Sequence, residues 1–134
     1  ISGIHLTPGQ QIHCELGRAV VAQCGSLITR VLYVKEGIGR KFLIVDAGMN
    51  DLMRPALYGA HHKIETVNAE ADACEEVYDV VGPVCESSDV FGKGEKLPAV
   101  RRGDLIALRS AGAYGESMAS TYNMRKLPGS LFIG

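Results

Sequence analysis

The chain has 134 residues, of which 46% are hydrophobic and 22% charged, a balance that fits one folded domain and excludes a disordered tail. Fourteen lysines and arginines against fifteen acidic residues give a formal net charge of −1. This removes the electrostatic case for binding nucleic acid or a membrane surface. Apolar runs such as 42–45 are too short to span a bilayer, and no signal peptide opens the chain. We therefore expect a cytoplasmic protein.

The four cysteines show neither a CxxC pair nor the ligand spacing of a zinc site, so we expect no metal. Because nothing marks the chain as secreted, free thiols are favoured over disulfides. Cys14, Cys24 and Cys74 are predicted to be small buried hydrophobes, and Cys85 is the exception.

The first half of the chain predicts short strands joined by turns. A strand is expected at 11–15 and a helical turn at 19–24. Residues 26–35 are β-branched and half alternating, which predicts a strand. A turn at 36–40 then leads into 41–46 as its hairpin partner.

Residues 47–60 do not resemble a strand and predict a short helix. Asn50 or Asp51 could cap its start, because both side chains accept hydrogen bonds from free backbone amides. Pro55 is tolerated in a first turn, where its missing N–H has no partner to lose.

The second half predicts strands at 63–68, 76–81, 104–109 and 131–133, with a polar loop at 87–98. Strand signals that recur between turns, with little helix, indicate a mainly β protein. The predicted fold is an antiparallel β-barrel or sandwich, Greek-key-like, with one or two short helices.

Four segments are rich in functional side chains, and loops on a rigid β scaffold are where binding and catalysis concentrate. They are 15–18 (ELGR), 46–58 (DAGMNDLMRPALY), 82–89 (GPVCESSD) and 112–123 (GAYGESMASTYN). In this order they resemble the C-terminal domain of diaminopimelate decarboxylase, a pyridoxal-phosphate enzyme of the alanine-racemase-like fold-type III group. The D-x-G-M-N-D…R-P-x-L-Y and C-E-S-x-D segments carry the resemblance most specifically. Leu16 departs from it, because the family usually has proline there.

The resemblance implies a division of the chain at residue 18. Residues 1–18 would be the end of a (β/α)8 barrel, including its last strand, and 19–134 the C-terminal β-barrel domain. The rest of the barrel, with the lysine that binds pyridoxal 5'-phosphate as a Schiff base, is not in this chain. The chain's own N-terminal barrel domain would be its first partner and a second copy its dimer partner. The isolated chain is then expected to be inactive.

The implied reaction converts meso-2,6-diaminopimelate to L-lysine and CO2 at an active site shared between two subunits. A related ornithine, arginine or carboxynorspermidine decarboxylase is one alternative. A binding module that keeps the fold without catalysis is the other.

Four residues would contact the cofactor or the substrate. The resemblance implies that Glu15 holds the proton on the cofactor's ring nitrogen, since a carboxylate raises the proton affinity of a neighbouring base. Arg18 and Arg54 offer planar forks for a carboxylate or phosphate, and Tyr58 would also reach the substrate. Taken from the residues alone, Glu15 fits a solvent-exposed strand end and Arg54 a surface cation at a helix start.

The resemblance also gives roles to the later segments. Cys85 would donate a proton near the reacting carbon in the partner's active site, where Glu86 would hold the distal ammonium of the substrate. Tyr114 would hydrogen-bond the cofactor phosphate or the substrate. Without the resemblance, Cys85 fits a buried structural thiol and Tyr114 a half-buried barrel tyrosine.

Two other signals indicate structure rather than a site. Neighbouring His61 and His62 would point to opposite faces of an extended segment, so surface histidines are expected there. The glycine-rich run 37–40 lacks the strand–loop–helix setting of a phosphate loop, which favours a hairpin turn.

Overall fold

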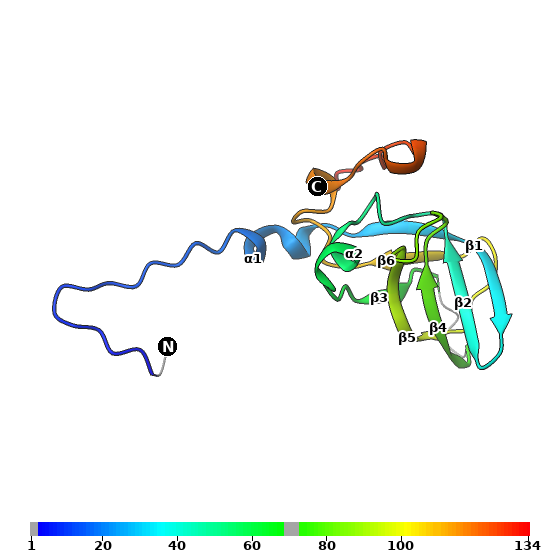
Figure 1. Cartoon of the computed structure of the whole chain (residues 1–134), viewed down its shortest axis with the longest axis horizontal. Coiled ribbons are helices and arrows are strands. Elements are labelled where there is room, and N and C mark those ends of the chain that lie inside the picture. Colours follow the sequence, from blue (N-terminus) through cyan, green and yellow to red (C-terminus); the bar gives the residue numbers. More distant parts are fainter. Residues whose placement is uncertain (1–2, 69–72) are drawn as a thin grey trace.

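The computed structural model describes residues 3–68 and 73–134 and shows a six-stranded, nearly closed β-barrel (Figure 1). The strands are β1 (Leu27–Gly37), β2 (Arg40–Val45), β3 (Ile64–Thr66), β4 (Glu75–Val81), β5 (Val90–Pro98) and β6 (Leu105–Leu108). Their order in the sheet is β3-β6-β1-β2-β4-β5. The two edge strands, β3 and β5, contact each other, which brings the sheet close to closure. The mainly β architecture predicted from the sequence is confirmed.

One of the strand pairings is parallel, which the prediction of an antiparallel barrel did not include. β1 pairs with β2 and with β6, β3 with β6, and β4 with β5, all antiparallel, whereas β2 and β4 are parallel. A parallel pair needs a long crossover connection. Residues 46–74 provide it, and the candidate functional segment 46–58 lies at its start.

The β1–β2 hairpin forms as predicted, with Gly37 paired to Arg40 across a two-residue turn. Gly39 in that turn has φ +72°, a conformation that glycine adopts without a Cβ clash. The barrel interior is filled by apolar side chains from all six strands and the loop after β2. The largest of the fully buried ones are Tyr78, Leu43, Leu52, Ile106, Leu108, Val31, Val45 and Val80.

The helices are all short: α1 (Gly17–Val21), η1 (Ala22–Cys24), α2 (Arg54–Tyr58), η2 (Glu116–Met118) and η3 (Tyr122–Met124). The helical turn predicted at 19–24 and the helix containing Pro55 in its first turn are both confirmed. The predicted caps were wrong, because the residue before α2 is Met53 and no side chain caps the helix. Gly59 ends α2 with φ +60° and donates its N–H to the Pro55 carbonyl.

Three further local predictions were wrong. Residues 11–15 and 131–133 form no strand, because neither segment has a neighbouring strand to pair with among the described residues. The predicted polar loop at 87–98 instead contains the nine-residue strand β5. Its polar sequence is strand only because it pairs with β4, and such pairing overrides the weak β-propensity of glycine and lysine.

The predicted environments of several cysteines and histidines also need correction. All four cysteines are free, and all four are exposed, so Cys14, Cys24 and Cys74 are not buried hydrophobes. His61 is exposed as expected, but His62 is buried, with Nδ1 2.9 Å from the Arg109 carbonyl oxygen. Sequence spacing could not reveal that carbonyl, because β6 brings it from far along the chain.

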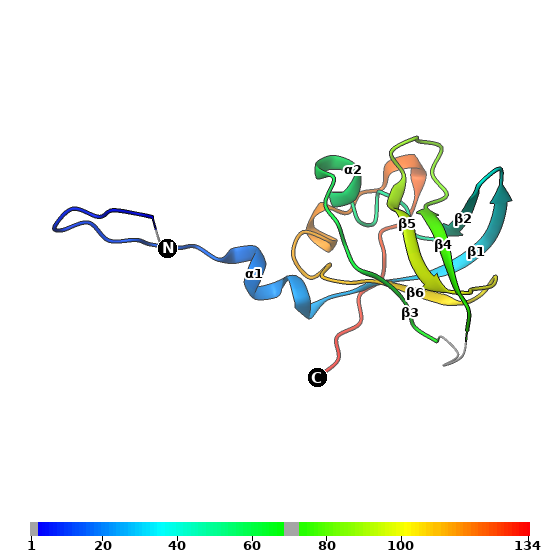
Figure 2. The same ribbon diagram turned by 90° about the horizontal axis from the view of Figure 1, so that it is seen from below.

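Residues 3–16 form a lead-in before α1 that extends away from the barrel (Figures 1 and 2). Among the described residues, no three or more metal-ligating side chains gather at one point. None of the described helices has the length and apolarity needed to cross a membrane.

Candidate functional site

Asp46 is the first residue of the loop after β2, and its side chain anchors the loop to the barrel. The Asp46 carboxylate accepts hydrogen bonds from the Thr29 hydroxyl at 2.6 Å and from the Arg30 backbone N–H at 2.8 Å. The Thr29 Oγ1 in turn accepts the N–H of Ala47 at 2.8 Å. Because Thr29 is buried on β1, the start of the loop is tied to the barrel wall.

Inside this loop, Asn50 and Asp51 close a turn rather than cap a helix. The Gly48 N–H donates to Asp51 Oδ2 at 2.8 Å, and Asn50 Nδ2 donates to Asp51 Oδ1 at 2.8 Å. The Asn50 carbonyl accepts the N–H of Ser120 at 2.9 Å, which joins the loop to the C-terminal segment. Both side chains are buried, so the loop delivers α2 from a rigid base.

α2 places the Arg54 guanidinium within cation–π distance of two tyrosine rings. Its guanidinium lies 5.4 Å from the ring centroid of Tyr58 and 5.4 Å from that of Tyr114. Tyr58 follows Arg54 by one helical turn, so the two side chains share a face of α2. Cation–π contacts of this kind hold a guanidinium plane without using its N–H groups.

Tyr114 comes from a distant part of the chain and has an unusual backbone. Its φ is +63°, in the left-handed region that a residue with a Cβ rarely adopts. Such strain costs about 1–3 kcal/mol and concentrates at functional sites. Tyr58 and Tyr114 remain 64% and 47% exposed, so both residues are accessible to a ligand that approaches Arg54.

The loop between β4 and β5 carries Cys85 and Glu86, both exposed. Glu86 Oε1 accepts the Ser87 hydroxyl at 3.3 Å and the Ser88 N–H at 3.4 Å. These long contacts leave the Glu86 carboxylate free to take a stronger partner. An exposed thiol beside an exposed carboxylate suits proton donation and cation binding better than it suits a structural core role.

Asp89 ties the two loops together, and the sequence motifs assigned it no role. Its Oδ1 accepts the Met49 N–H at 2.7 Å, and its Oδ2 accepts the Val84 N–H at 2.7 Å. Asp89 is only 3% exposed, and burial raises the pKa of its carboxyl, while the two backbone amides oppose that rise. The one sequence signal that could have indicated Asp89 was its position in the C-E-S-S-D segment.

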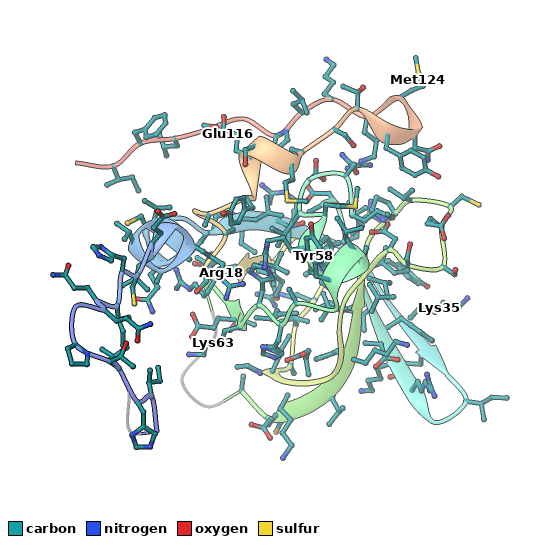
Figure 3. The ribbon with its side chains drawn as sticks, turned by 60° about the vertical axis from the view of Figure 1, so that its left-hand side comes forward. Arg18, Lys35, Tyr58, Lys63, Glu116 and Met124 are labelled. Atoms are coloured by element: carbon teal, nitrogen blue, oxygen red, sulfur yellow. The ribbon has the colours of Figure 1, made fainter. Side chains whose placement is uncertain are left out.

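The structure does not bring every expected site residue together. Arg54, Tyr58 and Tyr114 form one group, and Cys85 and Glu86 lie on the neighbouring loop. Glu15 lies in the exposed lead-in and Arg18 on α1, and their side chains form no hydrogen bond or ion pair within the described residues. Figure 3 labels Arg18 and Tyr58 on their separate elements.

Arg125 is a second residue that no sequence motif indicated. Its Nη2 donates to the Asp46 carbonyl and lies 3.7 Å from Asp51 Oδ2. Its Nε has no partner among the described residues. A lone arginine between Met124 and Lys126 carries no pattern of its own, so only the fold shows that it reaches the loop after β2.

Comparison with known proteins identifies the domain type. The family described as "Pyridoxal-dependent decarboxylase, C-terminal sheet domain" matches residues 19–112. The chain belongs to this family. The match begins within α1 and ends at the start of the segment 112–123, which carries Tyr114.

Named relatives of this pyridoxal-dependent decarboxylase domain are diaminopimelate decarboxylases. That of Bacteroides thetaiotaomicron is 66% identical over 93% of this chain and 32% of its own length. The crystal structure of the Helicobacter pylori diaminopimelate decarboxylase complexed with L-lysine is 52% identical over 82% of this chain and 27% of that chain, with a TM-score of 0.75. The Vibrio vulnificus lysine/ornithine decarboxylase, at 24% identity and a TM-score of 0.73, shares the fold. The chain thus spans about a third or less of the length of these relatives.

Proposed function

We propose that this chain is the C-terminal domain of a pyridoxal-phosphate-dependent diaminopimelate decarboxylase, which converts meso-2,6-diaminopimelate to L-lysine and CO2. The observation that carries the proposal is Arg54, whose guanidinium contacts two tyrosine rings and has no carboxylate partner among the described residues. A guanidinium fork kept free in this way binds a carboxylate in two parallel hydrogen bonds. The 66% identity to a named diaminopimelate decarboxylase supports the same reading.

The residues present fit an anionic ligand that carries carboxylate or phosphate groups. Arg54 supplies a cationic fork, and Tyr58 and Tyr114 supply accessible hydroxyl donors. Pyridoxal phosphate, when bound, supplies an electron sink for the carbanion that decarboxylation leaves. Tyr114 and Arg18 would hold the cofactor or the substrate, and Glu15 would keep the ring nitrogen protonated.

Two residues on the β4–β5 loop would act on the substrate itself. Cys85 is an exposed thiol and would give a proton to the carbon that loses CO2. Glu86 would hold the distal ammonium, while Arg54 holds the carboxylate beside it. Opposite charges thereby meet the two halves of the distal amino-acid group, which a simple diamine-forming substrate lacks.

Partners complete this site in the proposal. The exposure of Tyr58, Cys85 and Glu86 in this chain favours coverage by other protein surface, because catalysis of this kind needs water to be excluded. We assign that cover to the enzyme's own N-terminal barrel, which would supply the cofactor-binding lysine, and to a second subunit in a cytoplasmic homodimer. The 134-residue chain alone would then be inactive.

The decisive experiment measures CO2 release by the enzyme that contains this domain, with meso-diaminopimelate, ornithine, arginine and carboxynorspermidine offered in parallel, and L-lysine release from diaminopimelate. We expect kcat/KM for diaminopimelate to exceed the others by at least about a hundredfold, because a site that pairs the polar groups of its substrate discriminates strongly against analogues that lack them. Preference for ornithine, arginine or carboxynorspermidine would transfer the assignment to that substrate. No turnover of any of the four would favour a binding module.

A further inference from the structure

Asp89 is the one described side chain that hydrogen-bonds the backbones of both site loops. Met49 belongs to the loop that leads to Arg54, and Val84 directly precedes Cys85 and Glu86. Their two N–H groups meet the two oxygens of the same carboxylate, each at 2.7 Å. The position of Asp89 therefore sets the distance between the two loops.

The Asp89 carboxylate packs directly against the backbone of the β4–β5 loop. A Cβ on Gly82 would overlap the Asp89 carboxyl group, so the backbone of the β4–β5 loop touches the carboxylate directly. A Cβ on Gly48 would lie 2.8 Å from Cγ2 of Val84, which shows that the two loops are also in direct contact. Movement of Asp89 must therefore move the loops with it.

Arg125, from the C-terminal segment, is the cation near Asp51 and Asp89, and these three residues are called the cluster below. Asp51 and Asp89 are 7% and 3% exposed and belong to the two different loops. Burial raises the pKa of the Asp89 carboxyl. The Arg125 guanidinium, which lies 3.7 Å from Asp51, opposes that rise, whereas the charge on Asp51 adds to it. One cation thus compensates two buried carboxylates that would otherwise repel each other.

We propose that Asp89 and Arg125 are positioning residues, which hold the loop with Cys85 and Glu86 at a fixed place relative to the loop with Arg54. This inference rests on the proposed function, because that function gives the three residues their tasks. Asp89 works through Glu86 and Cys85 and does not itself touch the substrate. In a dimer with shared sites, the same cluster would link residues that serve two active sites.

The test uses the full enzyme and two substitutions that disturb the cluster differently. Asp89→Asn keeps the shape but turns an NH2 group toward a backbone N–H, and Gly82→Ala keeps the charge but displaces the carboxylate. Asp104→Asn is the matched control, because Asp104 also accepts a backbone N–H, that of Arg101 at 2.8 Å, in a loop outside the site. We expect both cluster variants to lower kcat/KM for diaminopimelate at least about tenfold, as misplacement by a fraction of an ångström does, and Asp104→Asn to leave it unchanged.

A double substitution separates positioning from loss of stability. If Asp89 acts through Glu86, then Asp89→Asn must cost much less in an enzyme that already carries Glu86→Gln. Full additivity of the two losses would overturn the proposal. Arg125→Lys, which keeps the charge, is expected to retain more activity than Arg125→Gln, and equal losses would remove Arg125 from the proposal.

A chemical readout keeps the inference separable from the proposed function. The rate of Cys85 alkylation by iodoacetamide, measured by peptide mass spectrometry against Cys24 in the same molecule, needs no substrate. We expect Asp89→Asn to change this ratio at least about threefold, because thiol reactivity follows local exposure and charge. An unchanged ratio would overturn the positioning role even if diaminopimelate is the substrate. A changed ratio in an enzyme that does not use diaminopimelate would support the positioning role and overturn only the substrate assignment.

Discussion

The guanidinium of Arg54 lies 5.4 Å from the ring centroid of Tyr114, although the two residues belong to opposite halves of the chain. Arg54 begins α2, whereas Tyr114 follows β6 in a turn with a left-handed backbone. The barrel brings them together because β6 pairs beside β1 and β3, so the chain after β6 emerges near the crossover that carries α2. The contact between Arg54 and Tyr114 therefore depends on the fold of the barrel and not on the sequence around either residue.

Arg54→Lys is expected to reduce substrate affinity in the full enzyme. Lysine keeps the charge but loses the planar fork and the stacking on both rings. We expect kcat/KM for diaminopimelate to fall at least about tenfold, equivalent to ~1.4 kcal/mol of transition-state stabilisation. Steady-state kinetics measures this, with Arg40→Lys on the exposed hairpin as the control. Equal activity of Arg54→Lys and wild type would contradict a bidentate role.

The left-handed backbone at Tyr114 predicts a difference between two substitutions that both remove the ring. Tyr114→Asn suits φ +63°, because asparagine tolerates the left-handed region, whereas the β-branched side chain of Tyr114→Val does not. The free energy of unfolding of the valine variant should be lower than that of the asparagine variant by about 1 kcal/mol or more. Denaturant titration provides the measurement. Equal stabilities would show that the turn relaxes.

Glu86 and Cys85 should give different kinetic phenotypes. Glu86→Gln should lower kcat/KM for diaminopimelate at least about tenfold, because an ammonium left unpaired in a closed site costs about 2–5 kcal/mol. Cys85→Ala should lower kcat with a smaller effect on KM, since a proton donor acts on the chemical step. Cys24→Ala, also an exposed thiol, is the control. Normal kcat/KM in Glu86→Gln, with normal cofactor absorbance, would remove Glu86 as the ammonium ligand.

Contact between the two site loops predicts that Gly48→Ala destabilises the domain. The added Cβ would lie 2.7 Å from Asn50 Oδ1 and 2.8 Å from Val84 Cγ2, so the loops must separate. Overpacking of this kind costs typically about 1–3 kcal/mol of unfolding free energy. Gly129→Ala is the control, because its Cβ would meet nothing within 4 Å and its φ is not left-handed. Similar midpoints in denaturant for the two variants would contradict the close approach.

The β2–β4 junction predicts how stability changes in acid. The Glu76 carboxylate lies 2.8 Å from the Lys41 ammonium and accepts the Tyr78 hydroxyl at 2.7 Å, and these contacts lower the pKa of Glu76 from its ordinary value of 4.5. A carboxyl group with a depressed folded-state pKa stabilises the fold above its unfolded pKa. That contribution is lost as the pH falls below 4.5 and through the lower folded-state value.

Glu76→Gln should therefore be less stable than wild type at neutral pH, and the difference should disappear in strong acid. Denaturant midpoints measured across that pH range test it. Glu75→Gln is the control, because Glu75 is exposed and lies 4.0 Å from Lys96. A difference for Glu76→Gln that persists unchanged at low pH would exclude the charged contact as its cause.

The amino-acid sequence by itself determined the mainly β class, the β1–β2 hairpin and the helix containing Pro55. In each case the information is local: β-branched alternation, a Gly-containing turn, and proline at a helix start. The four candidate functional segments and the decarboxylase resemblance were also readable, because short motifs such as C-E-S-S-D consist of adjacent residues.

Only the tertiary structure decided the features that depend on partners distant in the chain. The polar residues of β5 form a strand because β4 pairs with them, whereas 131–133 form none because no strand adjoins them. Asn50 and Asp51 look like helix caps in sequence, yet their buried side chains close a turn against Ser120 and Arg125. The Asp89 link between loops was equally invisible, because a carboxylate's hydrogen-bond partners follow from packing and not from spacing along the chain.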